Sequence, residues 1–179
     1  MAPAPRVATL ILGGARSGKS RFAECLAEQS GLARTYVATA QAFDDEMAER
    51  IAHHRARRDA AWTTLDTPLD LATTLAEAAG ESRIVLVDCL TLWLTNVMLA
   101  GRDVDAAIDA VVSALPLLGG PAILVSNEVG SGIVPENALG RAFRDHQGRL
   151  NQRVAAVADR VTLVVAGLPL DLKLPKEPT

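Results

Sequence analysis

The sequence predicts an α/β fold in which a mostly parallel central sheet lies between two layers of helices. Three observations predict it. Apolar runs of strand length alternate with stretches of helical length along the 179 residues. These runs are continuously apolar, as in strands that are buried on both faces. A glycine-rich turn, residues 13–20, joins the first run to the first helical stretch, as a strand–turn–helix phosphate-binding unit would.

The first half of the chain is expected to alternate strands and helices. The first strand covers residues 7–12 and the first helix begins near Phe22. A strand over 35–38 precedes a long amphipathic helix over 44–58, whose apolar residues recur at helical spacing. A short strand over 62–65 and a helix over 68–79 follow, because Pro68 suits the first turn of a helix.

The second half repeats this alternation. A buried strand over 83–88 ends in an acid, and helices are expected over 90–99 and 103–115. A strand over 121–126, a helix over 137–158 and a strand over 161–165 complete the sheet. No linker, repeat or low-complexity tract divides the chain, so we expect a single nucleotide-binding domain over residues 1–179. Residues 169–179, which include Pro175 and Pro178, are expected to form a loosely held tail.

Composition narrows the class of protein. A net charge of −3 argues against a general nucleic-acid binder, which needs a basic face. Cys25 and Cys89 lie in apolar contexts without metal-ligand spacing, so both are expected to be buried free thiols. No apolar stretch reaches membrane-spanning length without Gly, Pro or a charge, and the first residues lack a charged region typical of a signal peptide. We expect a soluble, cytoplasmic protein that does not insert into membranes.

The glycine-rich turn fits the P-loop pattern G-x-x-x-x-G-K-[ST]. Its backbone N–H groups and the helix N-terminus would hold phosphate oxygens. Lys19 would contact the β- and γ-phosphates, and the Ser20 hydroxyl would bind Mg²⁺. The alternative is a tight turn that binds nothing. The predicted phosphate-binding residues are Gly13, Gly14, Ala15, Arg16, Ser17, Gly18, Lys19 and Ser20.

Two further strand ends are expected at the same edge of the sheet. Asp88 ends an apolar strand, where a carboxylate supports Mg²⁺ in P-loop enzymes. It is also placed to cap the following helix, the simpler interpretation. Residues 127–132 (NEVGSG) follow another strand, and their glycines fit either close ligand approach or an ordinary turn.

The expected helix over 44–58 carries adjacent histidines. At helical spacing His53 shares the polar face with Glu49 and Arg57, whereas His54 turns toward the apolar side. An accessible imidazole beside arginines is a candidate nucleophile or acid–base group for phosphorus chemistry. A solvent-exposed histidine on a charged helix is the alternative.

Blocks of sequence in order along nearly the whole chain resemble the adenosylcobinamide kinase/adenosylcobinamide-phosphate guanylyltransferase family of cobalamin biosynthesis. The longest is residues 127–137, NEVGSGIVPEN. The others are residues 13–21 (GGARSGKSR), 36–40 (YVATA), 44–47 (DDEM), 50–54 (RIAHH), 87–91 (VDCLT), 143–145 (FRD) and 148–153 (GRLNQR). The resemblance implies a P-loop NTPase-type three-layer sandwich with a RecA-like central sheet.

The resemblance also implies two reactions at one nucleotide site. Adenosylcobinamide is phosphorylated with ATP or GTP, and GMP from GTP is then attached to that phosphate through a guanylyl-histidine, the role that falls on His53. Family members are homotrimers and use Mg²⁺, which Ser20 and Asp88 would bind. Besides the P-loop, the implied nucleotide-contact residues are Ala38, Thr39, Ala40, His54, Arg55, Ala56, Arg57, Asp66 and Asp88, the last two replacing Glu of relatives.

Three other functions are weighed against this one. A P-loop small-molecule kinase without guanylyl transfer would not use His53 covalently. A regulatory GTP-binding switch would need a guanine-reading Asn-Lys-x-Asp element, which the sequence lacks. A structural module with a vestigial P-loop would bind no Mg-nucleotide. Glu128 and Asp88 are both candidates for the base that deprotonates the cobinamide hydroxyl.

Overall fold

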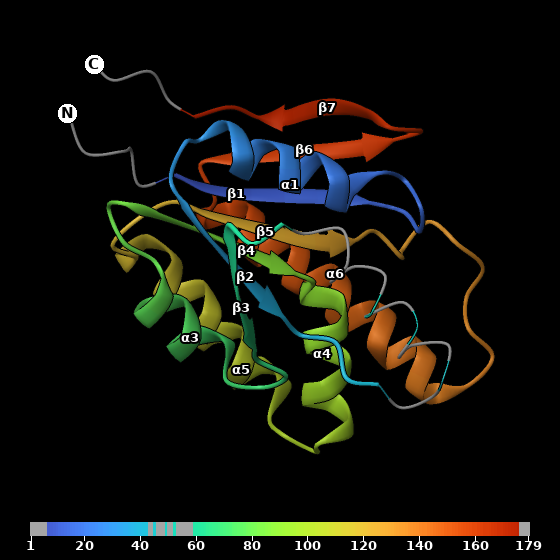
Figure 1. Cartoon of the computed structure of the whole chain (residues 1–179). Coiled ribbons are helices and arrows are strands. Elements are labelled where there is room, and N and C mark those ends of the chain that lie inside the picture. The colour runs from blue at the N-terminus through green and yellow to red at the C-terminus, as the bar shows by residue number, and fades with distance from the viewer. Residues whose placement is uncertain (1–6, 43–44, 46–48, 50–51, 53–58, 176–179) are drawn as a thin grey trace.

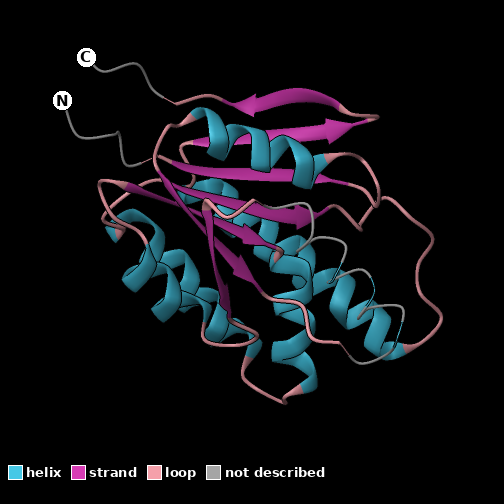
Figure 2. Cartoon of the chain, viewed as in Figure 1, coloured by secondary structure: helices cyan, strands magenta, loops and turns pink. Residues whose placement is uncertain are grey.

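A seven-stranded sheet runs through the protein, with helices on both faces (Figures 1 and 2). The computed structural model describes residues 7–42, 45, 49, 52 and 59–175. The strand order is β3-β2-β4-β5-β1-β6-β7, and only the β6–β7 pair is antiparallel. The strands are β1 (Ala8–Gly13), β2 (Ala33–Ala38), β3 (Trp62–Asp66), β4 (Arg83–Asp88), β5 (Ala122–Asn127), β6 (Arg160–Val165) and β7 (Leu168–Lys173). The predicted mostly parallel sheet is confirmed.

The helices divide between the two faces. They are α1 (Lys19–Gln29), α3 (Leu71–Ala78), α4 (Leu90–Leu99), α5 (Val104–Ala114), the short 3₁₀ helix η1 (Leu115–Leu117) and α6 (Ala138–Val157). Successive side chains of a strand point to opposite faces. In β1, Leu10 and Leu12 pack in the core beneath α3, α4, α5 and α6, while Ile11 packs in a second core with Ala23 and Ala27 of α1. The continuously apolar sequence of β1 therefore packs against helices on both faces of the sheet.

The boundaries follow the sequence closely where capping residues are present. Asp103 accepts a hydrogen bond from the Ala106 N–H at the start of α5, and Asn137 accepts one from the Gly140 N–H at the start of α6. The helix expected from Pro68 begins later, at Leu71. Most of the helix expected over 44–58 lies outside the described residues, although Asp45, Glu49 and Ala52 have helical backbone.

The expectation of a loose tail from residue 169 is wrong for residues 169–173, which belong to β7. Leucines alternate with other residues in this strand, a period-2 pattern typical of a strand. The Asp171 carboxylate accepts hydrogen bonds from the Thr162 hydroxyl (2.6 Å) and the Arg160 guanidinium on β6. These contacts, the Thr162 bond first, lower the pKa of Asp171. Pro169 is tolerated because β7 is an edge strand.

Candidate nucleotide-binding site

The carboxyl ends of the six parallel strands, β1 to β6, form one edge of the sheet, which we call the carboxyl rim. Gly13 of β1 pairs with Asn127 of β5, and Ala38 of β2 pairs with both Asp66 of β3 and Asp88 of β4. The fold thus brings the P-loop, the turn after β2 and both predicted aspartates to the same edge. Ligands of open α/β sheets bind at such an edge.

The turn between β1 and α1 has the backbone of a phosphate cradle. Gly18 has φ 95° and Arg16 has φ 56°, so the chain curls through the left-handed region before the helix starts. A Cβ on Gly13 would lie 2.7 Å from the Val164 carbonyl oxygen and would collide with the Ser17 hydroxyl. The turn therefore requires glycine at position 13, its first residue, and also at position 18.

Lys19 and Ser20 stand at the first turn of α1, where the helix dipole favours anions. The Lys19 ammonium donates to the Gly14 carbonyl oxygen at 3.1 Å, so it lies along the turn. Asp88, half-buried, accepts a hydrogen bond from the Tyr36 hydroxyl at 3.1 Å. An alcohol and a carboxylate are the hard oxygen donors that Mg²⁺ prefers, so the pair Ser20 and Asp88 fits this ion. Among the described residues no three His, Cys, Asp or Glu side chains gather into a metal cluster.

Buried hydrogen bonds from Cys89, between β4 and α4, and from Asn96 of α4 hold the turn after β2 in place. The Thr39 hydroxyl donates to the Cys89 carbonyl oxygen (2.7 Å) and accepts from the Cys89 N–H (2.9 Å). The Asn96 amide donates to the carbonyl oxygens of Thr39 (2.7 Å) and Pro68 (3.0 Å). Burial raises the pKa of the Cys89 thiol to about 11, with a smaller contribution from the Asp88 charge. Cys25, by contrast, is exposed, so its expected burial is wrong.

A buried polar network lies under the β5 end of the rim. The Asn127 N–H donates to the Thr91 hydroxyl at 2.8 Å, and the Asn151 amide donates to the Asn127 carbonyl at 3.0 Å. Asn151 in turn accepts from the Ser126 hydroxyl and the Gln147 amide. The Oδ1 atom of Asn127 is buried and has no hydrogen-bond partner within the described part of the chain. Next in the chain, the Glu128 N–H donates to the Gly13 carbonyl, which ties this strand end to the P-loop.

The P-loop is also held from its other side by the hairpin that joins β6 and β7. The Gly167 N–H donates to the Ser17 carbonyl oxygen at 2.9 Å. A Cβ on Gly18 would approach the Gly167 Cα to 3.4 Å, so the two turns are in contact. The phosphate cradle therefore has supports from β5 and from the last hairpin.

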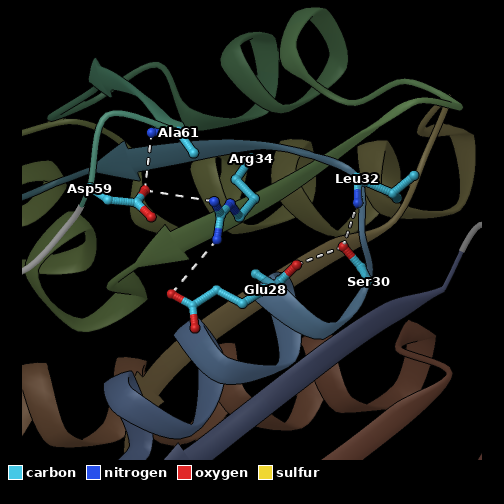
Figure 3. A network of polar contacts seen from close by, with 7 residues as sticks. Glu28, Ser30, Leu32, Arg34, Asp59 and Ala61 are labelled. Atoms are coloured by element: carbon cyan, nitrogen blue, oxygen red, sulfur yellow. Dashed lines mark hydrogen bonds and ion pairs between the residues drawn. The ribbon is translucent and has the colours of Figure 1, made fainter.

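The segment expected to carry His53 is flanked by residues at opposite edges of the sheet. Gln41 follows the carboxyl end of β2, whereas Asp59 precedes the amino end of β3. The Arg34 guanidinium forms ion pairs with Asp59 (3.6 Å) and with Glu28 at the end of α1 (3.7 Å) (Figure 3). It also lies over the Trp62 ring. His53, His54, Arg55, Ala56 and Arg57 themselves lie outside the described residues.

Sequence reasoning missed the residues that hold the rim together. Asn96, Thr91 and Asn151 are polar positions on helices, and nothing in their local pattern marks which carbonyl or amide they reach. Their one signal is a polar side chain on an otherwise apolar helical face, as at Asn96 in the run LTLWLTNVML. Such residues are buried only when they are hydrogen-bonded.

Comparisons with known proteins agree with the geometry. Residues 9–172 match the family model described as cobinamide kinase / cobinamide phosphate guanyltransferase. The "Bifunctional adenosylcobalamin biosynthesis protein CobP" of Pseudomonas aeruginosa is 56% identical, over 92% of this chain and 96% of that protein. The corresponding CobU protein of Salmonella typhimurium is 41% identical, over 92% and 98% of the two chains.

Solved structures show the same fold in distant proteins. The flagellar accessory protein FlaH of Methanocaldococcus jannaschii aligns with a TM-score of 0.53 at 14% identity, covering 95% of this chain and 79% of that one. The RadB recombinase aligns with a TM-score of 0.53 at 17% identity, covering 89% and 74%. The predicted P-loop NTPase-type fold is confirmed. Within the described part of the chain, no helix has the length and hydrophobicity that a membrane span requires.

Proposed function

Because this chain belongs to the cobinamide kinase / cobinamide phosphate guanyltransferase family, we propose that it performs both reactions at one nucleotide site on the carboxyl rim. The overall activity follows from family membership over nearly the whole chain. The use of one site is supported by the rim, because the part of the chain that the structure describes contains one P-loop and the predicted nucleotide-contact residues Ala38, Asp66 and Asp88 share its edge. Adenosylcobinamide is the proposed acceptor, with GTP and ATP as nucleotide substrates.

In the kinase step, the hydroxyl oxygen of cobinamide attacks the γ-phosphorus of the nucleotide. The new P–O bond forms as the bond to the β,γ-bridging oxygen breaks, and the nucleoside diphosphate leaves. Backbone N–H groups of the P-loop and the Lys19 ammonium stabilise the charge on the departing diphosphate. The hydroxyl proton passes to a rim carboxylate, either Asp88, the last residue of β4, or Glu128, which follows β5.

In the transfer step, a ring nitrogen of His53 attacks the α-phosphorus of GTP. A P–N bond forms, the bond to the α,β-bridging oxygen breaks, and pyrophosphate leaves. A phosphate oxygen of cobinamide phosphate then attacks the same phosphorus, the P–N bond breaks, and the imidazole is restored. Two easier displacements replace one difficult one. His54, Arg55, Ala56 and Arg57 are the proposed nucleotide contacts of the same segment.

Ser20 and Asp88 are the proposed ligands of Mg²⁺, which, when bound, neutralises charge on the phosphates. Asp88 is oriented for this role by the Tyr36 hydroxyl. Ser20 is oriented by its place in the first turn of α1. Both residues belong to regular secondary structure, Ser20 to α1 and Asp88 to β4.

One experiment tests the histidine intermediate. The wild-type protein is incubated with GTP labelled at the α-phosphate, and an acid-labile, base-stable protein adduct is expected. His53→Ala should abolish the adduct, whereas His146→Ala should keep it, because His146 lies on α6 and contacts Arg149. Equal labelling of wild type and His53→Ala would refute the assignment. Absence of an adduct in a wild type that still phosphorylates cobinamide would favour the kinase-only alternative.

We also propose that the protein is a cytoplasmic homotrimer. The β6–β7 hairpin supports self-association, because Val165, Leu168, Leu170 and Leu172 are all exposed on it. Sedimentation equilibrium is the direct measurement. A single species at the mass of one chain, over a wide range of concentrations, would contradict the trimer.

A further inference from the structure

The loop between β5 and α6 exposes apolar side chains beside the carboxyl rim. Ile133 is 97% exposed, Val134 is 55% exposed, and Leu139, in the first turn of α6, is 60% exposed. Figure 1 shows this loop as an arc that leaves the end of β5 and passes beyond the strand ends before it enters α6. Exposing three large apolar side chains within seven residues is unfavourable in water unless a ligand or partner covers them.

The loop is anchored at both ends. At its start the Glu128 N–H donates to the Gly13 carbonyl, and the Glu128 carboxylate accepts from the Gly130 N–H at 2.7 Å. At its end the Arg141 guanidinium donates to the carbonyl oxygens of Pro135 (3.1 Å) and Glu136 (2.5 Å). The apolar residues therefore lie between two fixed points instead of at the end of a free segment.

The position and charge of the loop indicate what covers it. The loop begins one residue after Asn127, which pairs with Gly13 at the start of the phosphate cradle. An acceptor hydroxyl has to approach the γ-phosphate closely, so the rest of the acceptor lies within reach of this loop. Between Asn127 and Leu139 the sequence holds two acids, Glu128 and Glu136, and no Lys or Arg. Such a surface suits a large, apolar-faced and cationic molecule better than an anionic one.

We propose that Ile133, Val134 and Leu139 form the docking surface for the corrin ring of cobinamide, a broad macrocycle with a cationic cobalt centre. This proposal rests on the proposed function and adds to it the place where the acceptor is seated. The ring packs against the aliphatic side chains, and its hydroxyl-bearing arm extends toward the cradle. Phosphorylation and guanylyl transfer then use the same seat, because the macrocycle is common to both acceptors.

The test measures two Michaelis constants in one assay. Cobinamide is varied at saturating nucleotide, and nucleotide is varied at saturating cobinamide, for wild type and for the double variant Ile133→Ser/Val134→Ser. Both positions are exposed, so the variant is expected to fold normally. The KM for cobinamide should rise about tenfold, as expected when aliphatic packing is lost, while the KM for nucleotide stays unchanged.

A matched control separates position from hydrophobicity. Leu117→Ser removes an exposed leucine at the end of η1, before β5 and therefore at the opposite edge of the sheet, and it should leave both constants unchanged. An active wild type with unchanged constants in the double variant would overturn this proposal alone. So would a double variant that changes the oligomeric state but keeps the KM for cobinamide, because the loop would then be a subunit contact. A wild type that does not phosphorylate cobinamide would overturn the proposed function as well.

Discussion

Alanine at Gly13 should distort the phosphate cradle, whereas alanine at the neighbouring Gly14 should not. The added Cβ at Gly13 would lie 2.7 Å from the Val164 carbonyl oxygen and would also collide with the Ser17 hydroxyl, but among the residues that the structure describes a Cβ at Gly14 meets no atom within 4 Å. Val164 is the β6 partner of Gly13, so relief of the contact has to separate two paired strands. Overpacking of this kind costs roughly 1–3 kcal/mol.

The assay is thermal unfolding without nucleotide, followed by circular dichroism. For a chain of this size, a loss of about 2 kcal/mol lowers Tm by roughly 4–8 °C. Gly13→Ala should show this shift relative to Gly14→Ala, and its affinity for nucleotide should fall further because the cradle is displaced. If the two variants melt within about 1 °C of each other, the described contact between the P-loop and β6 does not constrain the turn.

Three further predictions concern Tyr36, Asn96 and the two cysteines. Tyr36→Phe removes the hydroxyl that orients Asp88 but keeps the ring against Trp62, so kcat for cobinamide phosphorylation should fall and the Mg²⁺ requirement should rise, while stability changes little; an unchanged Mg²⁺ titration would contradict this. Asn96→Leu leaves the buried carbonyls of Thr39 and Pro68 unpaired, so chemical denaturation should report a loss of about 2–3 kcal/mol. At pH 8 a thiol reagent should modify Cys25 in the native protein and spare buried Cys89, because a pKa of about 11 leaves only about 0.1% thiolate; mass spectrometry identifies the modified site.

Much of the sheet could be predicted from the sequence because its strands are buried on both faces. Residues 83–88 and 90–99 have the predicted bounds, since a continuous apolar run and the helical stretch after it leave little ambiguity. The sequence predicts a tail where β7 lies because Pro169, Pro175 and Pro178 outweigh the alternation of its leucines. The predicted start of α3 differs from the observed one because Pro68 precedes the helix instead of lying in its first turn.

The candidate site also has one part that the sequence predicts and another that it does not. A P-loop is recognised from local sequence, because its glycines, lysine and serine lie within eight consecutive residues. The supports of that loop are remote: Asn127 on β5 and Gly167 in the last turn come beside it only through strand order. Strand order cannot be predicted from the local sequence, so these contacts become visible only in the folded structure. The role of His53 stays a prediction.

The place of β1 in the sheet has a consequence for how the protein is made. This strand is synthesised before both of its neighbours in the sheet, β5 and β6, which follow it by more than 100 residues. A nascent chain that ends before residue 160 would expose one long side of β1 and lack the turn that braces the cradle. Affinity for nucleotide should therefore appear only after β6 has been synthesised. A chain cut before residue 160 should bind nucleotide poorly although every residue of its P-loop is intact.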